Sequence, residues 1–369
     1  MRPLVELQTA SGTVTSMNTT QKFVVQTVED NRVLQSFVES SWSSAYAGRM
    51  TFPVWSQTYF DWQFSRRAGE PDRRLAVYNG ETLAAVLLGV PCSFEAASNS
   101  FRGAHWSWLS VAESFRGRGL VKLLDSARVN LELKAGSDLI VSYRQSGSRH
   151  SLAERPSTRF PLKSFHSRPG FWAHALDGRR VLKWNLNRFE GVLGRLMTLV
   201  MPKVEMRFSD GIRMLHHSDL DQCRQVANRQ FEQCVLRIRW DEKSIEHQLA
   251  GSPISQTVVA EAAGIVCGFV NFHILPFQGL TLEPVAIIDL ICVNQLRPEM
   301  QVKLIRSALG LMRQQGAILA LKIRCQDVAA PLMLKTGFAA RWPDTSLVLQ
   351  WTHTARPIPK KKPVHVLWR

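Results

Sequence analysis

The chain has 369 residues, of which 45% are hydrophobic and 21% are charged, and its formal net charge at pH 7 is +16. This composition excludes an intrinsically disordered chain, and the length favours two domains of ordinary size. The positive charge favours anionic partners such as phosphate-bearing cofactors, nucleic acids or an anionic membrane, but it does not rank them against a merely solvated basic surface.

Neither a membrane span nor an export signal is predicted. No window approaches the roughly 18 to 20 apolar residues that a spanning helix needs, and residues 1–16 lack the apolar core of a signal peptide. We therefore expect a soluble, cytoplasmic protein. The six cysteines form no C-x-x-C pair and have no histidine at ligand spacing, so we expect reduced core thiols and no metal.

In chain order, the aperiodic, Ser/Thr-rich residues 1–20 are predicted to be disordered. Hydrophobic periodicity then predicts a strand, two helices, a hairpin turning at Asn79-Gly80, an aromatic-rich strand, an amphipathic helix and a further strand. These elements are expected at 22–27, 30–42, 55–64, 75–78, 82–90, 104–111, 120–131 and 138–143. A polar, basic loop is expected over 145–169, followed by two extended pieces within 170–184 that are separated by Asp177-Gly178.

The second half is expected to repeat this order of elements. Its helices are predicted at 219–230, 241–249 and 301–314, and its strands at 257–261, 265–274, 286–293 and 318–323. Gly170-Phe171 and Gly337-Phe338 lie 167 residues apart, and seven of fifteen residues are identical at that offset. The organisation predicted from this is a first domain over 21–200, a second over 201–354 and a basic, Pro-rich tail over 355–369.

The run from Arg116 to Val121 has the composition of an anion cradle. It lies between a predicted strand and a predicted helix, where successive main-chain N–H groups and the helix dipole favour a phosphate. Gly117 and Gly119 let the backbone approach a ligand closely, and Arg116 and Arg118 add two guanidinium groups.

Residues 108–111 and 115–120 together resemble the acetyl-CoA pyrophosphate loop of the GNAT superfamily. The family pattern has Arg or Gln, then two residues, Gly, one residue, and Gly or Ala; Arg116 and Gly119 match it, and Val121 stands at the small position. The resemblance implies an α/β (α+β) fold of two tandem GNAT-like domains, each a mixed, mostly antiparallel sheet flanked by helices. It implies that the strand before the loop splays from its neighbour, and that acetyl-CoA or another acyl-CoA binds at Leu109, Ser110, Val111, Arg116, Gly117, Arg118, Gly119, Leu120 and Val121.

The second half has the fold signature without the site. Residues 327–338 resemble the family's last helix and its Gly-Phe turn, which in the first half is matched by Gly170-Phe171. The loop over 294–300, however, contains no glycine, a proline without an N–H and the acidic Glu299. We expect this half not to bind CoA.

Acyl transfer from a thioester to an amine needs a base for the amine and an acid for the leaving thiolate. Family members often use a carboxylate on the central strand and a Tyr four residues before the Gly-Phe pair; here the latter position is His166. His166 and Tyr143 are rival candidates for the acid, and His105 is the candidate base, with ordinary structural roles as the alternative for each. Two roles stay open for Trp106, Trp108 and Trp172, namely packing in the core or forming the wall of an acceptor or acyl pocket.

The function expected is an acyl-CoA-dependent N-acyltransferase, in the first place an acetyltransferase, acting on the amine of an acceptor held between the halves. Two alternatives stay open. One is a Fem-like transferase that uses an aminoacylated tRNA, which the positive charge would suit. The other is a non-catalytic binding module that has kept the GNAT fold.

Overall fold

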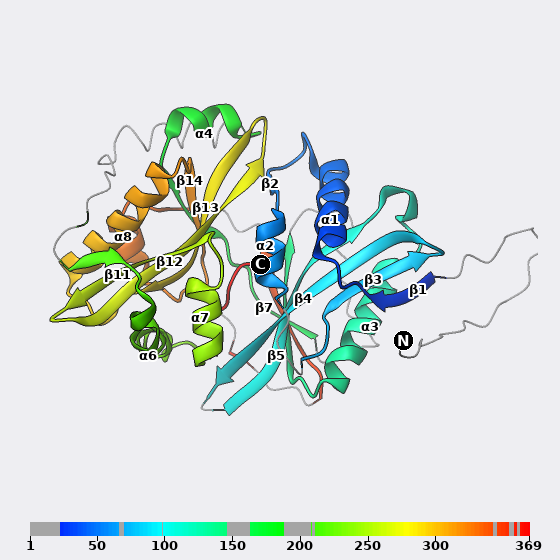
Figure 1. Ribbon diagram of the computed structural model, residues 1–369, viewed down its shortest axis with the longest axis horizontal. Helices are drawn as coiled ribbons and strands as arrows, with labels where there is room; N and C mark the ends of the chain where they lie inside the picture. Colours follow the sequence, from blue (N-terminus) through cyan, green and yellow to red (C-terminus); the bar gives the residue numbers. More distant parts are fainter. Residues whose placement is uncertain are drawn as a thin grey trace, which may run out of the picture.

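The computed structural model describes residues 23–65, 70–97, 99–145, 163–187, 208, 211–341, 345–353, 358–359 and 362–369. They form two twisted sheets that lie side by side, with the end of the chain between them (Figure 1). Each sheet has helices on both faces. The predicted α/β class with two mixed, mostly antiparallel sheets is confirmed, since only β5–β6, β13–β14 and β10–β17 pair in parallel among the described strands.

The first sheet follows the order β1-β3-β4-β5-β6-β16-β7, and β10 joins β4 with β17 beside it. Its strands are β1 (Phe23–Thr27), β3 (Arg74–Asn79), β4 (Thr82–Ala96), β5 (Asn99–Val111), β6 (Leu139–Gln145), β7 (Lys163–Ser167), β10 (Leu236–Ile238), β16 (Thr345–Trp351) and β17 (Val364–His365). Leu75 and Val77 pack with helix α3 (Leu120–Lys134), whereas Ala76 packs in the cluster with helices α1 (Asn31–Tyr46) and α2 (Gln57–Gln63) on the other face.

The second sheet follows the order β15-β8-β14-β13-β12-β11-β9, with the short β2 on β12. Its strands are β2 (Phe52–Pro53), β8 (Phe171–Ala175), β9 (Ile212–Met214), β11 (Ser255–Ala262), β12 (Ile265–Gln278), β13 (Leu282–Cys292), β14 (Leu319–Ile323) and β15 (Ala339–Ala340). Buried residues of helices α8 (Pro298–Gln314) and α9 (Ala330–Lys335) pack on one face. Helices α6 (Leu220–Gln230) and α7 (Glu242–Ala250) pack on the face toward the first sheet.

The two halves exchange strands. β16, from the end of the second half, lies between β6 and β7 and pairs antiparallel with β6 from Thr345↔Gln145 to Trp351↔Leu139. β8, from the end of the first half, lies between β14 and β15 and pairs antiparallel with β14 from Leu319↔Ala175 to Ile323↔Phe171. Each sheet is therefore completed by the other half of the chain. The boundary predicted near residue 200 stays a prediction, because residues 188–207 lie outside the described part.

Only one of the two extended pieces predicted within residues 170–184 is a strand. The first extended piece is β8, but the second is helix α4 (Gly178–Trp184), because the Asp177 carboxylate caps it by accepting from the N–H groups of Arg179 and Arg180, both at 3.1 Å. The similarity at an offset of 167 thus matches the whole of this helix with strand β16. In the two sheets, the counterpart of β16 is β8.

The other predicted elements form where they were expected, with longer strands. The hairpin at Asn79-Gly80 is confirmed, and β4 continues to Ala96. Part of the expected loop over 145–169 is strand β7, whereas residues 146–162, like residues 1–20, lie outside the described residues. None of the helices in the described ranges is long and apolar enough to cross a membrane.

The cysteines are free thiols, as expected. Cys223, Cys234, Cys292 and Cys325 are buried, whereas Cys92 and Cys267 are only partly buried, which corrects the expectation that all are core residues. Burial raises the pKa of Cys223 and of Cys234 to about 12. These two thiols stay protonated at neutral pH and are poor nucleophiles.

Helix α3 is fixed to its sheet by a buried carboxylate. The side chain of Glu132, which is fully buried, accepts from Arg73 Nε at 2.8 Å, from Arg73 Nη2 at 3.1 Å and from Trp106 Nε1 at 2.8 Å. The Ser137 hydroxyl donates to the same carboxylate. Removing Glu132 would leave the buried Arg73 guanidinium with only the more exposed Glu70 carboxylate, at 3.7 Å.

Replacement Glu132→Ala is expected to lower the free energy of unfolding by about 3–5 kcal/mol, because the buried Arg73 loses its main counter-ion and Trp106 Nε1 loses its acceptor. The measurement is urea unfolding followed by far-UV circular dichroism. Asp221→Ala is the control, since it removes an exposed ion pair with Arg224 and is expected to leave the unfolding midpoint nearly unchanged. Equal midpoints for the two variants would contradict the role assigned to Glu132.

Candidate functional site

The glycine-rich loop opens helix α3. After the 3-10 turn η1 (Glu113–Phe115), Gly117 and Gly119 have φ of 78° and 81°, a left-handed conformation that glycine adopts without steric cost. No atom lies within 4 Å of the position that a Cβ would take on either glycine, so the space beside the loop is open. The helix has no side-chain N-cap, which leaves the N–H groups of its first turn available to an anion.

The two arginines of the loop have different surroundings. Arg116 Nε donates to the carbonyl of Val111 at 3.3 Å, and its Nη2 donates to the carbonyl of Ser41 in α1 at 3.4 Å. Arg116 therefore ties the loop to the end of β5 and to α1. The Arg118 guanidinium lies over the ring of Phe115, 5.3 Å from its centroid. Of the two, Arg118 is the more exposed and the better placed to meet a phosphate.

In the second half, two glutamine side chains bond to the backbone between β13 and α8. Gln230 Oε1 accepts from the N–H groups of Val293 and Asn294 at 2.8 and 2.9 Å. Gln301 Nε2 donates to the carbonyls of Val293 and Leu296 at 3.2 and 3.0 Å. Side chains of this half thus brace the segment that follows β13, and helix α8 opens with Pro298, which has no N–H to offer a phosphate.

Before the glycine loop, strand β5 separates from β6. The parallel pairing runs from Gly103↔Leu139 to Trp106↔Ser142 and ends there, although both strands continue. This is the splay expected from the resemblance. On its other side β5 carries a β-bulge, in which Trp108 and Leu109 face the single residue Leu87 of β4.

The bulge reorients the side chains at the point of the splay. Trp108 has φ of 53°, uncommon for a bulky residue, and its ring is buried, whereas the next residue, Leu109, is 41% exposed. The Ser110 hydroxyl accepts from Trp42 Nε1 at 3.0 Å and donates to the Trp108 carbonyl at 3.1 Å. At Ser110 the main chain, and not the side chain, is the part available to a ligand along this edge.

A cavity of about 60 Å³ lies between the two halves, next to the splay. It is lined by parts of α2, β4, β5, β6 and α7 and by the segments 238–241 and 366–369. Three of its lining side chains have buried polar atoms without a hydrogen-bond partner in the described chain: Gln63 Nε2, His105 Nε2 and Trp240 Nε1. Unpartnered buried polar groups are costly, so their convergence on one cavity is typical of a ligand site.

His105 lines the cavity on the side of the first half, and Tyr143 lies in contact with it. Their rings are 5.1 Å apart and perpendicular, at 89°. Burial, and next the charge of Arg369, lowers the pKa of His105 to about 3, so the imidazole is neutral. The Tyr143 hydroxyl donates to the carbonyl of Leu367 at 3.0 Å, and burial raises its pKa well above the ordinary value. Both groups are uncharged at neutral pH.

The remaining predicted residues have separate places. His166 lies in strand β7, near a register shift against β16, and its side chain is outside the described residues. Its backbone is thus extended, where a loop was expected, and its role stays a prediction. Trp106 Nε1 donates to Glu132 in the core of the first sheet, and Trp172 packs in the core of the second.

The wall of the cavity from the second half is held by a buried ion pair. Arg369 Nη1 lies 2.7 Å from Asp289 Oδ1, and Arg369 Nη2 donates to Gln248 Oε1 at 2.7 Å. His273 Nδ1 lies 2.9 Å from the other oxygen of Asp289. Burial alone would raise the pKa of Asp289, but Arg369 and His273 bring it below its ordinary value.

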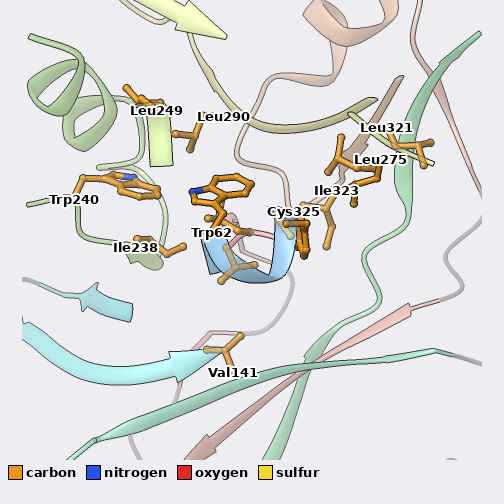
Figure 2. Packing of buried hydrophobic residues seen from close by; sticks show 14 of the residues in the cluster. Trp62, Val141, Ile238, Trp240, Leu249, Leu275, Leu290, Leu321, Ile323 and Cys325 are labelled. Carbon is orange, nitrogen blue, oxygen red and sulfur yellow. The ribbon is translucent and has the colours of Figure 1, made fainter. Parts of the chain in front are cut away.

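Helix α2 fills the space between the sheets. Trp62 lies among Ile238, Trp240, Leu249 and Leu290, with Val141 of β6 below it (Figure 2). Its Nε1 donates to the carbonyl of His247 at the end of α7, at 2.8 Å. Sequence reasoning missed Gln63, Trp240, Gln248 and Arg369, because no local pattern distinguishes them and only the packing of distant segments brings them together.

The fold can be compared with solved structures. Two crystal structures of Saccharomyces cerevisiae N-myristoyltransferase with bound myristoyl-CoA superpose with TM-scores of 0.74 and 0.75, at 13% and 15% sequence identity. The alignments cover 94% and 97% of this chain and 83% and 87% of the yeast chains. This chain has the tandem GNAT fold of N-myristoyltransferase. No family model matches the sequence, and no curated protein matches it.

Within the N-myristoyltransferase fold, this chain combines one open glycine loop with one loop closed by its own side chains. The GNAT fold that the loop residues and the order of elements implied is therefore confirmed. Sequence identities of 13% and 15% establish a shared fold but not shared substrates. The role of each residue of the site therefore rests on the geometry described above.

Replacement Gly119→Ala is expected to weaken CoA binding about fivefold or more, because a left-handed alanine costs roughly 1–2 kcal/mol and the loop relaxes to avoid it. Titration calorimetry with CoA gives the Kd. Gly264→Ala is a matched control, since Gly264 has φ of +77° and equally open surroundings in the second half. An unchanged Kd for CoA in Gly119→Ala would show that the glycine loop does not bind CoA.

The pKa of His105 has a consequence for stability. At pH values between the ordinary histidine pKa, near 6.5, and the folded-state pKa of His105, about 3, the unfolded chain binds a proton that the folded chain does not. The free energy of unfolding therefore falls as the pH falls below about 6.5. From pH 7.5 to 5.0 the loss due to this histidine is about 2 kcal/mol, and His105→Phe is expected to abolish it in urea unfolding. His217→Phe, at an exposed histidine, serves as the control. The same loss in His105→Phe as in the unaltered protein would contradict this account.

Proposed function

We propose that this chain is an acyl-CoA-dependent N-acyltransferase that transfers a short acyl group, acetyl in the first place, to the amine of an acceptor bound between its halves. The observation that carries the proposal is the path from the glycine loop along the unpaired edge of β5 to the cavity at His105. The loop suits the pyrophosphate of CoA, and a strand edge with free main-chain groups suits the amides of the pantetheine arm. The bound myristoyl-CoA of the yeast enzymes supports the same class of co-substrate.

The short acyl group is inferred from the packing behind the bulge. The Trp108 ring lies 5.2 Å from the ring of Phe64, 6.3 Å from those of Tyr59 and Phe60, and 6.5 Å from that of Trp55. All five rings are at most 6% exposed. A long acyl chain directed past Trp108 would have to displace this aromatic cluster, whereas an acetyl group needs only the space of the cavity.

The acceptor is inferred from the polar atoms of the cavity. The Trp240 indole N–H and the Gln63 amide group are donors that lack an acceptor, so they suit a ligand with oxygen atoms near its amine. The neutral His105 can accept a hydrogen bond from the attacking amine through Nε2 and orient it. Because its pKa is about 3, the proton released as the amide forms passes to solvent and does not stay on the imidazole. Tyr143, which stays protonated, is the nearby proton donor for the CoA thiolate, and His166 remains the alternative donor.

The reaction is tested with acetyl-, octanoyl- and myristoyl-CoA and a panel of amino acids and short peptides, with amide products identified by mass spectrometry. We expect transfer from acetyl-CoA at the highest kcat/KM. His105→Phe is expected to lower this value by about 100-fold or more while the Kd for CoA is retained. Products from myristoyl-CoA alone would overturn the acetyl preference, and tRNA binding without CoA binding would favour an aminoacyl-tRNA-dependent transferase.

A variant of the aromatic cluster tests the chain-length argument separately. Phe64→Leu opens space behind Trp108 and is expected to raise the affinity for octanoyl-CoA relative to acetyl-CoA. Phe101→Leu removes the same atoms from a ring that is equally buried but packs on Trp351, so it should leave the ratio unchanged. Identical ratios in both variants would show that the cluster does not limit the acyl chain.

A further inference from the structure

The turn between β12 and β13 carries two large apolar side chains in solvent. Leu280 is 61% exposed and Leu282 is 56% exposed, with the exposed Thr281 between them. The apolar residues on either side of this turn, Phe277 and Val285, are buried in the core. We call residues 280–282 the apolar tip. Two large apolar side chains exposed together at the end of a hairpin are typical of an interaction surface.

The apolar tip is held in place from both sides. The Leu280 N–H donates to the carbonyl of Trp184, the last residue of α4, at 2.8 Å. On the other side, Gln278 pairs with Phe52 of β2. Figure 1 shows α4 and this end of the β12–β13 hairpin at the same edge of the molecule. The position of the two leucines is therefore set by the fold and not by a free loop.

Three exposed cations belong to the two segments that hold the apolar tip. Arg179 and Lys183 lie one helical turn apart on α4, and Arg49 precedes Phe52 by three residues. Within the described part of the chain, none of the three forms an ion pair. The nearest acids are engaged elsewhere, since Asp177 caps α4 and Glu283 pairs with Arg180. The surroundings of the tip are thus positive.

We propose that the apolar tip and these three cations dock the protein on an anionic membrane surface. Leucines inserted at the boundary between headgroups and acyl chains gain by leaving water, while Arg and Lys stay in the headgroup layer beside anionic lipid. An RNA would use the cations but not the leucines, and a neutral bilayer would use the leucines but not the cations. The combination fits a negatively charged bilayer, which also agrees with the net charge of +16.

The experiment is co-sedimentation of the full chain with vesicles of 70% phosphatidylcholine and 30% phosphatidylserine, and with vesicles of phosphatidylcholine alone, at 0.1 M salt. Binding is expected only to the first. The double variant L280S/L282S is expected to bind at least about tenfold more weakly. The double variant R179E/K183E is expected to bind at least about 25-fold more weakly, because each replaced cation contributes about fivefold or more. These are surface changes, and unchanged melting temperatures would verify that the variants fold.

Ile265→Ser is the matched control, because Ile265 is also 61% exposed but lies at the opposite end of β12. It should bind the vesicles as the unaltered chain does. The proposal is overturned if the unaltered chain does not bind the anionic vesicles, or if Ile265→Ser weakens binding as much as L280S/L282S. It is also overturned if L280S/L282S keeps full binding while R179E/K183E loses it and poly(U) competes, since that result would indicate a general polyanion surface. None of these outcomes depends on CoA binding or on acyl transfer.

Discussion

The exchange of β8 and β16 is the constraint on which the rest of the structure depends. A strand in the middle of a sheet is held by main-chain hydrogen bonds on both edges, so β16 cannot leave β6 and β7 without exposing the backbone of all three. The same holds for β8 between β14 and β15. The two sheets therefore cannot move apart as ordinary tandem domains do, and a cavity between them keeps its shape.

The chain end after β16 uses this fixed geometry. Residues 362–369 run between the sheets and bond to both: Leu367 accepts from Tyr143 of the first, and Arg369 pairs with Asp289 of the second. Earlier in the segment, His365 Nδ1 lies 3.2 Å from Asp327 Oδ2, and the same oxygen accepts a hydrogen bond from Lys322 Nζ at 2.8 Å. Such buried charges add little stability over apolar residues, but losing one partner is costly, so they specify where the segment lies.

The sequence predicted those features of the fold and site that depend on neighbouring residues. The turn at Asn79-Gly80, the helix start at Gly119 and the capping Asp241 each act within a few residues, and their elements form as predicted. That the second half does not bind CoA stays a prediction; Gln230 and Gln301 hold its loop, in addition to the residues noted in the sequence.

What the sequence could not show depends on distant segments. No periodicity distinguishes a strand that pairs within its own half from one that pairs with the other, so the place of β16 was not predicted. Asp177 is compatible with either a tight turn or the start of a helix. Here its side chain stabilises the helix, because it accepts hydrogen bonds from two N–H groups of α4. Gln63 and Trp240 approach His105 only because α2 and the segment before α7 are packed between the sheets.

The exchanged strands also dictate an order of events during synthesis. β6 must wait for a partner that emerges from the ribosome some 200 residues later, since Leu139 pairs with Trp351. Until then the edge of a largely apolar strand is open, and the closure of so long a loop makes productive pairing slow. The nascent first half is thus expected to depend on protection from premature association, whereas the completed chain, with both edges covered, unfolds only as a whole.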